Sequence, residues 1–99
     1  MRLTQSYVET IRATALEMFG PDAVVRLFGS RVDDSKRGGD VDLHVVLPQA
    51  LDDWRTKYRF IDQVQDRSDD DRKIDLILLE PGMPLGWIDQ VALRDGIVL

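Results

Sequence analysis

The sequence predicts an α/β (α+β) fold in which helices pack against a small mixed β-sheet. Two long segments repeat apolar residues every three or four positions, as amphipathic helices do. Three shorter apolar and β-branched runs end at glycine or proline, as strands do. The 99 residues are 43% hydrophobic, enough for one modest core. We therefore expect a single domain over residues 1–99.

The expected elements follow the order helix, strand, strand, helix, strand, helix and, if the last residues are extended, strand. In chain order they are Ser6–Phe19, Ala23–Phe28, Val41–Leu47, Leu51–Arg67, Lys73–Leu79, Gly86–Arg94 and Ile97–Leu99. The first helix is expected to begin with an S-x-x-E capping box, Ser6 to Glu9, and to end at Gly20.

Three further expectations concern individual elements. In the second helix, Trp54 and Tyr58 share one stripe, with Phe60 and Val64 next to it. Acidic residues 52–53 lie in the first turn, where the helix dipole favours negative charge. The run Lys73–Leu79 is the most apolar of the chain and is expected as a buried central strand. The third helix is expected to turn residues 88, 91 and 92 inward.

Composition excludes several classes of function. The uncharged stretches, such as Pro81–Ile88, are far shorter than the roughly 20 apolar residues of a membrane span. The N-terminus lacks the apolar core of a secretory signal, so we expect a cytoplasmic protein. The absence of cysteine excludes thiol catalysis and thiolate zinc sites, and the single histidine excludes most His-rich metal sites. A net charge of -5 disfavours unaided nucleic-acid binding, because such binding depends on neutralising phosphates.

Three aspartates form the most informative pattern. Asp40 and Asp42 lie two residues apart on an expected strand, so their side chains share one face. Asp75 is a lone carboxylate in the most apolar run, and pairing of the two strands would place it beside them. Three clustered carboxylates could hold hard divalent cations such as Mg²⁺ or Mn²⁺. Read separately, the first pair is also compatible with a solvated strand edge, and Asp75 with an outward-facing strand residue.

Gly29 and Ser30 follow the first expected strand and suggest a phosphate site. Glycine allows close approach of a ligand to the backbone, serine supplies a hydroxyl, and consecutive amides in a turn can bind an anion. A strand ending in Gly-Ser is also common in ordinary turns. The combination with the aspartates at a fixed spacing makes the pattern more specific.

The remaining polar and aromatic features have simpler interpretations. His44 shares the strand face of Asp42, and we expect it to be structural or to support the site indirectly. The acidic run 69–71 is interpreted as a solvated charge run offset by neighbouring Arg67 and Arg72. Trp54 and Trp87 are expected in the core or facing a partner.

The pattern Gly29-Ser30, nine intervening residues, Asp40-Val41-Asp42 and a later Asp75 resembles the signature of the nucleotidyltransferase superfamily related to DNA polymerase beta. The chain is most similar to the minimal, MNT-type members, some of which are antitoxins paired with all-helical HEPN toxins. The resemblance covers nearly the whole sequence and implies the nucleotidyltransferase fold.

The resemblance implies a role for each matching residue. Gly29 and Ser30 would contact nucleotide phosphates, and Asp40 and Asp42 would hold two metal ions. Asp75 would help to bind the catalytic metal and to activate the acceptor hydroxyl.

One departure from the family pattern affects the phosphate loop. Minimal members often continue Gly-Ser-Arg with Ala-Arg-Gly, whereas this chain continues with Val32-Asp33-Asp34. Arg31, Lys36 and Arg37 lie in the same loop and are expected to neutralise a triphosphate.

The implied activity is Mg²⁺-dependent transfer of AMP, or another nucleoside monophosphate, from a nucleoside triphosphate to a protein hydroxyl. By resemblance the acceptor is a tyrosine of a HEPN-type toxin, which makes the protein an antitoxin in a hetero-oligomer. One alternative is a non-catalytic antitoxin or regulatory subunit that acts by binding. Transfer to a small molecule or an RNA 3′ end is disfavoured by the missing extra domain and by the acidic charge, respectively.

Overall fold

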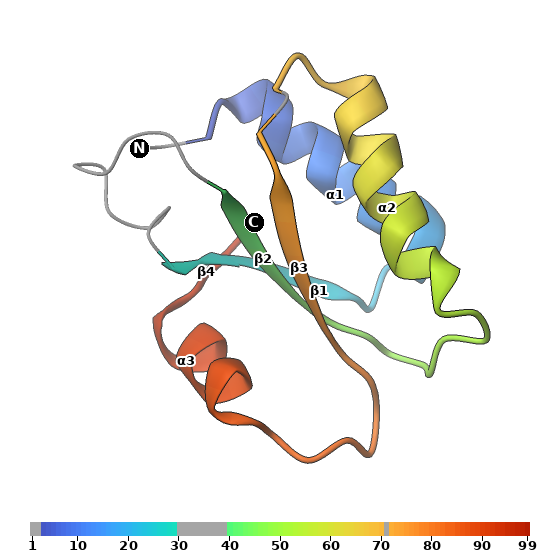
Figure 1. Cartoon of the computed structure of the whole chain (residues 1–99), viewed down its shortest axis with the longest axis vertical. Helices are drawn as coiled ribbons and strands as arrows, with labels where there is room; N and C mark the ends of the chain where they lie inside the picture. Colours follow the sequence, from blue (N-terminus) through green and yellow to red (C-terminus); the bar gives the residue numbers. More distant parts are fainter. Residues whose placement is uncertain (1–2, 30–39, 71) are drawn as a thin grey trace.

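The computed structural model describes residues 3–29, 40–70 and 72–99. Its elements, coloured along the chain in Figure 1, are α1 (Gln5–Phe19), β1 (Val24–Phe28), β2 (Val41–Val46), α2 (Arg55–Arg67), β3 (Ile74–Leu79), α3 (Trp87–Asp95) and β4 (Ile97–Val98). The predicted order of elements, including the last strand, is confirmed. In the described part of the chain, no helix is long and apolar enough to cross a membrane.

The four strands form one mixed sheet in the order β3-β2-β1-β4. β1 pairs antiparallel with β2 and with β4, whereas β2 and β3 are parallel. The predicted α/β class is therefore correct. β3, however, lies at the edge of the sheet, so the expectation of a central position was wrong. Its apolar composition reflects the packing of Ile74 and Leu76 beneath α2, while Asp75 between them points away from that core.

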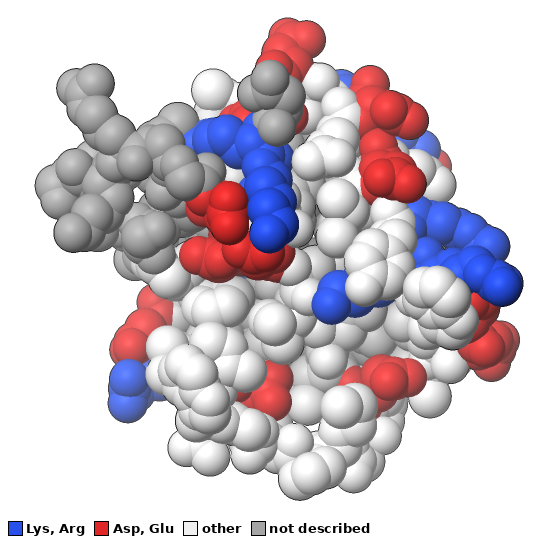
Figure 2. Space-filling view, viewed as in Figure 1, with Lys and Arg blue, Asp and Glu red and all other residues white. Residues whose placement is uncertain are grey.

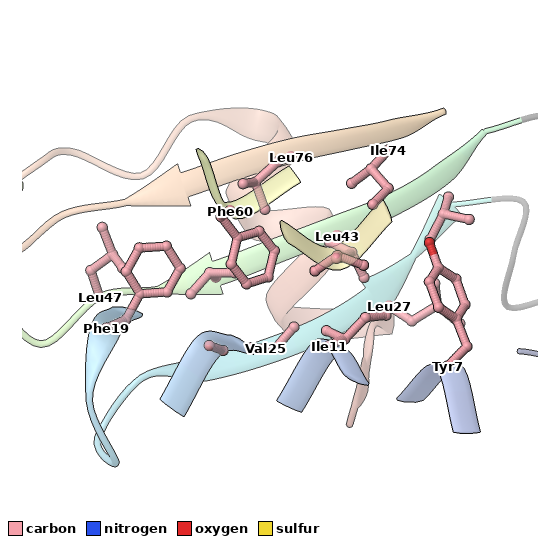
Figure 3. Packing of buried hydrophobic residues seen from close by; sticks show 14 residues of the cluster. Tyr7, Ile11, Phe19, Val25, Leu27, Leu43, Leu47, Phe60, Ile74 and Leu76 are labelled. Carbon is pink, nitrogen blue, oxygen red and sulfur yellow. The ribbon is translucent and has the colours of Figure 1, made fainter. Parts of the chain in front are cut away.

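The main core lies between the sheet and the helices α1 and α2 (Figure 3). Alternate residues of β2, beginning with Val41, are completely buried there together with Phe60 and Val64 of α2. Phe19 and Phe60 stack with ring centroids 5.3 Å apart and join the two helices. The opposite face of the sheet is covered by α3, whose Asp89 contacts His44 of β2. The fold is therefore a sheet with two helices on one face and one on the other.

The start of α1 differs from the expectation. Thr4, not Ser6, caps the helix, because the Thr4 hydroxyl accepts a hydrogen bond from the Tyr7 amide at 3.1 Å. The predicted end is correct, since Gly20 adopts φ +89° and its amide donates to the Leu16 carbonyl.

The second helix begins four residues later than Leu51, where it was expected to start. The Leu51 amide donates to the Glu80 carboxylate at 2.7 Å, and the Asp53 carboxylate accepts from the Arg55 amide at 2.9 Å. These two contacts hold the segment in a turn, so the acidic residues precede the helix instead of occupying its first turn.

The structure also shows which side chains of α2 are buried and which form ion pairs. Trp54 is 69% exposed and Tyr58 is also exposed, because Phe60 and Val64 form the buried stripe. Arg67 pairs with Glu17 of α1, and Arg72 pairs with Asp70 of the acidic run. Trp87 is 76% exposed, so neither tryptophan belongs to the core.

Candidate active site

The parallel pairing of β2 and β3 brings two of the predicted site residues together. Asp42 and Asp75 are direct partners in the register, and residues in direct register on neighbouring strands point to the same face of the sheet. Their neighbours Val41, Leu43, Ile74 and Leu76 are buried in the main core on the other face. Both carboxylates are partly exposed on the α3 side of the sheet.

The third aspartate lies close by in the sequence but outside the sheet. Asp40 directly precedes β2, two residues before Asp42. In residues 3–29, 40–70 and 72–99, no three acidic or histidine side chains are grouped so that they could hold a metal ion. The paired carboxylates Asp42 and Asp75 are therefore the part of the predicted cluster that the structure brings together, and the metal-binding role of all three stays a prediction.

A lysine accompanies the carboxylate of β3. The Lys73 ammonium lies 3.7 Å from Asp75 Oδ1, with both side chains largely exposed. Figure 2 shows basic side chains (blue) beside acidic ones (red) at the upper left, next to the residues drawn in grey. The charges of the site are therefore of both signs, and such a surface can accept a cation and a phosphate side by side.

The position of Gly29 explains why glycine follows β1. Its φ is +73°, and a Cβ atom placed there would lie only 2.5 Å from Asp42 Oδ2. Any other residue would have to displace the Asp42 carboxylate, so the two positions are coupled sterically. Ser30, Arg31, Lys36 and Arg37, the other predicted nucleotide-binding residues, lie outside the described residues.

Below the carboxylates, the same face of the sheet contains a buried polar contact. His44 is completely buried, and its Nε2 lies 2.7 Å from Asp89 Oδ1 of α3. The other carboxylate oxygen of Asp89 accepts the Gly86 amide at 2.9 Å, at the start of the helix. The hydrogen bond from His44, more than that from Gly86, lowers the pKa of Asp89 against the opposing effect of burial.

The burial of Ala92 agrees with the expectation from the sequence, whereas the burial of Asp89 was not predicted. The available signal was its place three residues after Gly86, where an acidic side chain can accept a hydrogen bond from the backbone at a helix start. The complete burial of His44 is compatible with the expectation that this residue is structural or supports the site indirectly.

Two hollows in the described surface lie elsewhere. One, of about 410 Å³, lies between α1 and the strands β1 and β4. The other, of about 380 Å³, lies beside the turn before α2. Neither hollow is lined by Gly29, Asp40, Asp42 or Asp75, the predicted site residues that the structure describes.

Carboxylates paired across neighbouring strands beside a glycine turn make up the kind of site that metal-dependent phosphoryl transfer uses. The family model of the nucleotidyltransferase domain matches residues 8–88, most of the chain. The protein therefore belongs to the nucleotidyltransferase domain family, and nucleotidyl transfer is the general class of chemistry that this membership supports. A comparison with curated proteins found no match.

Proposed function

We propose that this protein is a Mg²⁺-dependent nucleotidyltransferase that moves AMP, or another nucleoside monophosphate, from a nucleoside triphosphate to a hydroxyl group of a protein. The observation that supports this proposal most is the direct register of Asp42 with Asp75. Gly29 lies next to this pair, at a position where a Cβ would overlap the Asp42 carboxylate.

The donor chemistry of the site fits the proposed metal. Asp42 and Asp75 offer carboxylate oxygens, which are hard ligands suited to Mg²⁺ or Mn²⁺, and Asp40 lies two residues away along the chain. When bound, such ions would neutralise phosphate charge and stabilise the departing pyrophosphate. Lys73, beside Asp75, supplies a further positive charge for phosphate oxygens.

The chain's own residues have separate tasks in the proposed reaction. Gly29 and Ser30 bind the phosphates and orient the α-phosphorus toward the acceptor. Asp75 takes the proton of the acceptor hydroxyl while the hydroxyl oxygen bonds to the α-phosphorus. The bond from the α-phosphorus to the oxygen bridging to the β-phosphate breaks, and pyrophosphate leaves.

We further propose that the acceptor is a tyrosine of a HEPN-type helical toxin and that the protein acts as an antitoxin within a hetero-oligomer. The surface offers support for a protein partner. The uncharged segment 81–87 is exposed throughout, including Met83, Leu85 and Trp87. The lower edge of Figure 2, where Figure 1 places this segment, is mostly white. Exposed apolar surface of this kind is typical of interaction sites.

The same surface favours a second candidate, an antitoxin that neutralises its partner by contact alone. The two functions differ in their dependence on Asp42. Neutralisation of the partner by contact should be unaffected by Asp42→Asn, whereas neutralisation by modification should be lost. Dose-dependent rescue of partner-induced growth arrest by wild type and variant distinguishes them.

The class of reaction can be tested directly with labelled ATP. The protein is incubated with Mg²⁺ and lysate of the source cells, using ATP labelled either at the α-phosphate or at the γ-phosphate. We expect α-label, and not γ-label, on one protein band, which identifies the acceptor. Label from the γ-position would contradict nucleotidyl transfer. If the protein binds a partner but that partner carries no label, the result would favour neutralisation of the partner by contact alone.

A further inference from the structure

A buried polar contact joins α3 to the face of the sheet that carries the candidate site. His44 and Asp89 are 0% and 8% exposed, and their hydrogen bond spans 45 positions of the sequence. Because the Asp89 carboxylate can only accept, His44 Nε2 is the donor. With its second oxygen on the Gly86 amide, Asp89 holds the first turn of α3 against β2.

Stability alone does not require this pair. Buried polar pairs are often no more stabilising than apolar side chains of similar volume, because both partners lose their hydration. The imidazole also keeps its Nδ1 buried with no hydrogen-bond partner among the described residues. An apolar side chain would avoid that cost, so the hydrogen bond points to a role in orienting the ring.

The His44 ring is connected to the candidate site through Phe28. The two rings meet edge to face, with centroids 6.4 Å apart and planes at 86°. Phe28 is the register partner of Asp42, and the next residue is Gly29, where an added Cβ would lie 2.5 Å from Asp42 Oδ2. The contacts thus run from Asp89 through His44 and Phe28 to the two residues that shape the site.

We propose that His44 and Asp89 are positioning residues for nucleotidyl transfer: their hydrogen bond fixes the ring that supports Phe28, and thereby sets the placement of Gly29 and Asp42. The transfer part of this inference rests on the proposed function. The structural part, that the pair controls the placement of Gly29 and Asp42, does not. The lowered pKa of Asp89 agrees with a charged acceptor at this position.

The test compares His44→Leu, which removes the donor, with His44→Gln, which keeps a side-chain N–H. The matched control is Glu17→Gln, which removes a carboxylate that accepts hydrogen bonds from Arg67 away from this face. We expect His44→Leu to lower kcat about tenfold or more with KM for ATP within about threefold, because misplacement of reacting groups acts on the chemical step. His44→Gln should recover most of the activity, and Glu17→Gln should resemble wild type.

A second readout needs no activity. In ¹H–¹⁵N spectra of the full chain, His44→Leu should shift the amide signals of Gly29 and Asp42, and Glu17→Gln should leave them in place. If His44→Leu does not fold, Asp89→Ala removes the acceptor and supplies the same comparison. Unchanged Gly29 and Asp42 signals would overturn the inference, as would losses of activity that simply follow losses of thermal stability across all variants.

The two readouts also separate this inference from the proposed function. Shifted amide signals in a protein whose wild type transfers no nucleotide would support the structural link and contradict the proposed reaction. Full transfer by His44→Leu would contradict the positioning role and leave the proposed reaction standing.

Discussion

Gly29 is the residue at which backbone conformation and site chemistry meet most closely. Replacement by alanine meets two obstacles, the φ of +73° and the overlap with Asp42 Oδ2 at 2.5 Å. Gly20 provides a matched control, since its φ is +89° and a Cβ there would meet nothing within 4 Å in the described part of the chain.

We expect both Gly29→Ala and Gly20→Ala to cost about 1 kcal/mol or more in the free energy of unfolding, because a residue with a Cβ is strained at positive φ. Only Gly29→Ala should also lower nucleotidyl transfer, by roughly tenfold or more, because it moves a carboxylate of the site. Urea titration and the α-label assay measure the two effects. Equal transfer by the two variants would show that the contact with Asp42 has no bearing on activity.

Tyr7 carries a buried hydroxyl for which the described residues offer no hydrogen-bond partner. Burial, and to a lesser extent Asp70, raises its pKa to about 12. A phenol whose pKa is higher in the folded than in the unfolded chain favours folding below pH 10, and this contribution is lost as the pH rises toward 12.

We therefore expect wild type to lose stability between pH 10 and 12 more steeply than Tyr7→Phe. At neutral pH the variant should be about as stable as wild type, because it removes a buried polar atom that lacks a partner. Thermal unfolding followed across this pH range measures both. Parallel curves for the two proteins would contradict the assignment of the alkaline loss to Tyr7.

At the scale of the elements, the attachment of α3 depends on the charge of Asp89. Its pKa is lowered in the folded chain, chiefly by His44. For a carboxyl group with a lowered pKa, the contribution to folding is complete above the pKa of the unfolded chain, near 3.8, and disappears as the pH falls through the lower folded value.

Below about pH 4, wild type should therefore lose stability faster than Asp89→Asn, whose side chain does not titrate. Urea unfolding at several pH values between 2 and 5 gives the two curves. The same acid dependence in both would mean that other carboxylates account for the loss. Glu17→Gln serves again as the control for removal of a carboxylate on another element.

The elements themselves were largely predictable from the sequence, because periodicity and turn residues are local signals. The errors arose where distant contacts decide. The turn before α2 depends on Glu80, which follows β3, and the sequence pattern of residues 51–67 does not contain that information. β3 resembles a central strand because its alternate residues lie beneath a helix, although it lies at the sheet edge.

The candidate site was predictable to a similar extent. Strand alternation placed Asp42 on the face opposite the main core, and pairing of its strand with that of Asp75 was considered, but the sequence pattern did not predict that the two strands are parallel. Asp89 was missed because an isolated acidic residue near a helix start normally remains in solvent, and its burial depends on the partner His44 across the sheet.

Across the whole molecule, the chain combines an overall net charge of -5 with an exposed, uncharged segment at residues 81–87. The repulsion between carboxylates and a triphosphate agrees with the proposed role of a cation, and the exposed apolar residues suit the proposed protein partner. These features agree with a transferase that acts on another protein, which is the central proposal for this chain.

The most direct test of that proposal is the transfer of α-label from ATP by wild type, Asp42→Asn and Asp62→Asn, the last being an exposed carboxylate of α2 away from the site. We expect Asp42→Asn to reduce transfer by roughly a hundredfold or more, because it removes a ligand for the proposed metal ions, and Asp62→Asn to match wild type. Transfer by Asp42→Asn within about tenfold of wild type would contradict the assignment of Asp42 to the metal site.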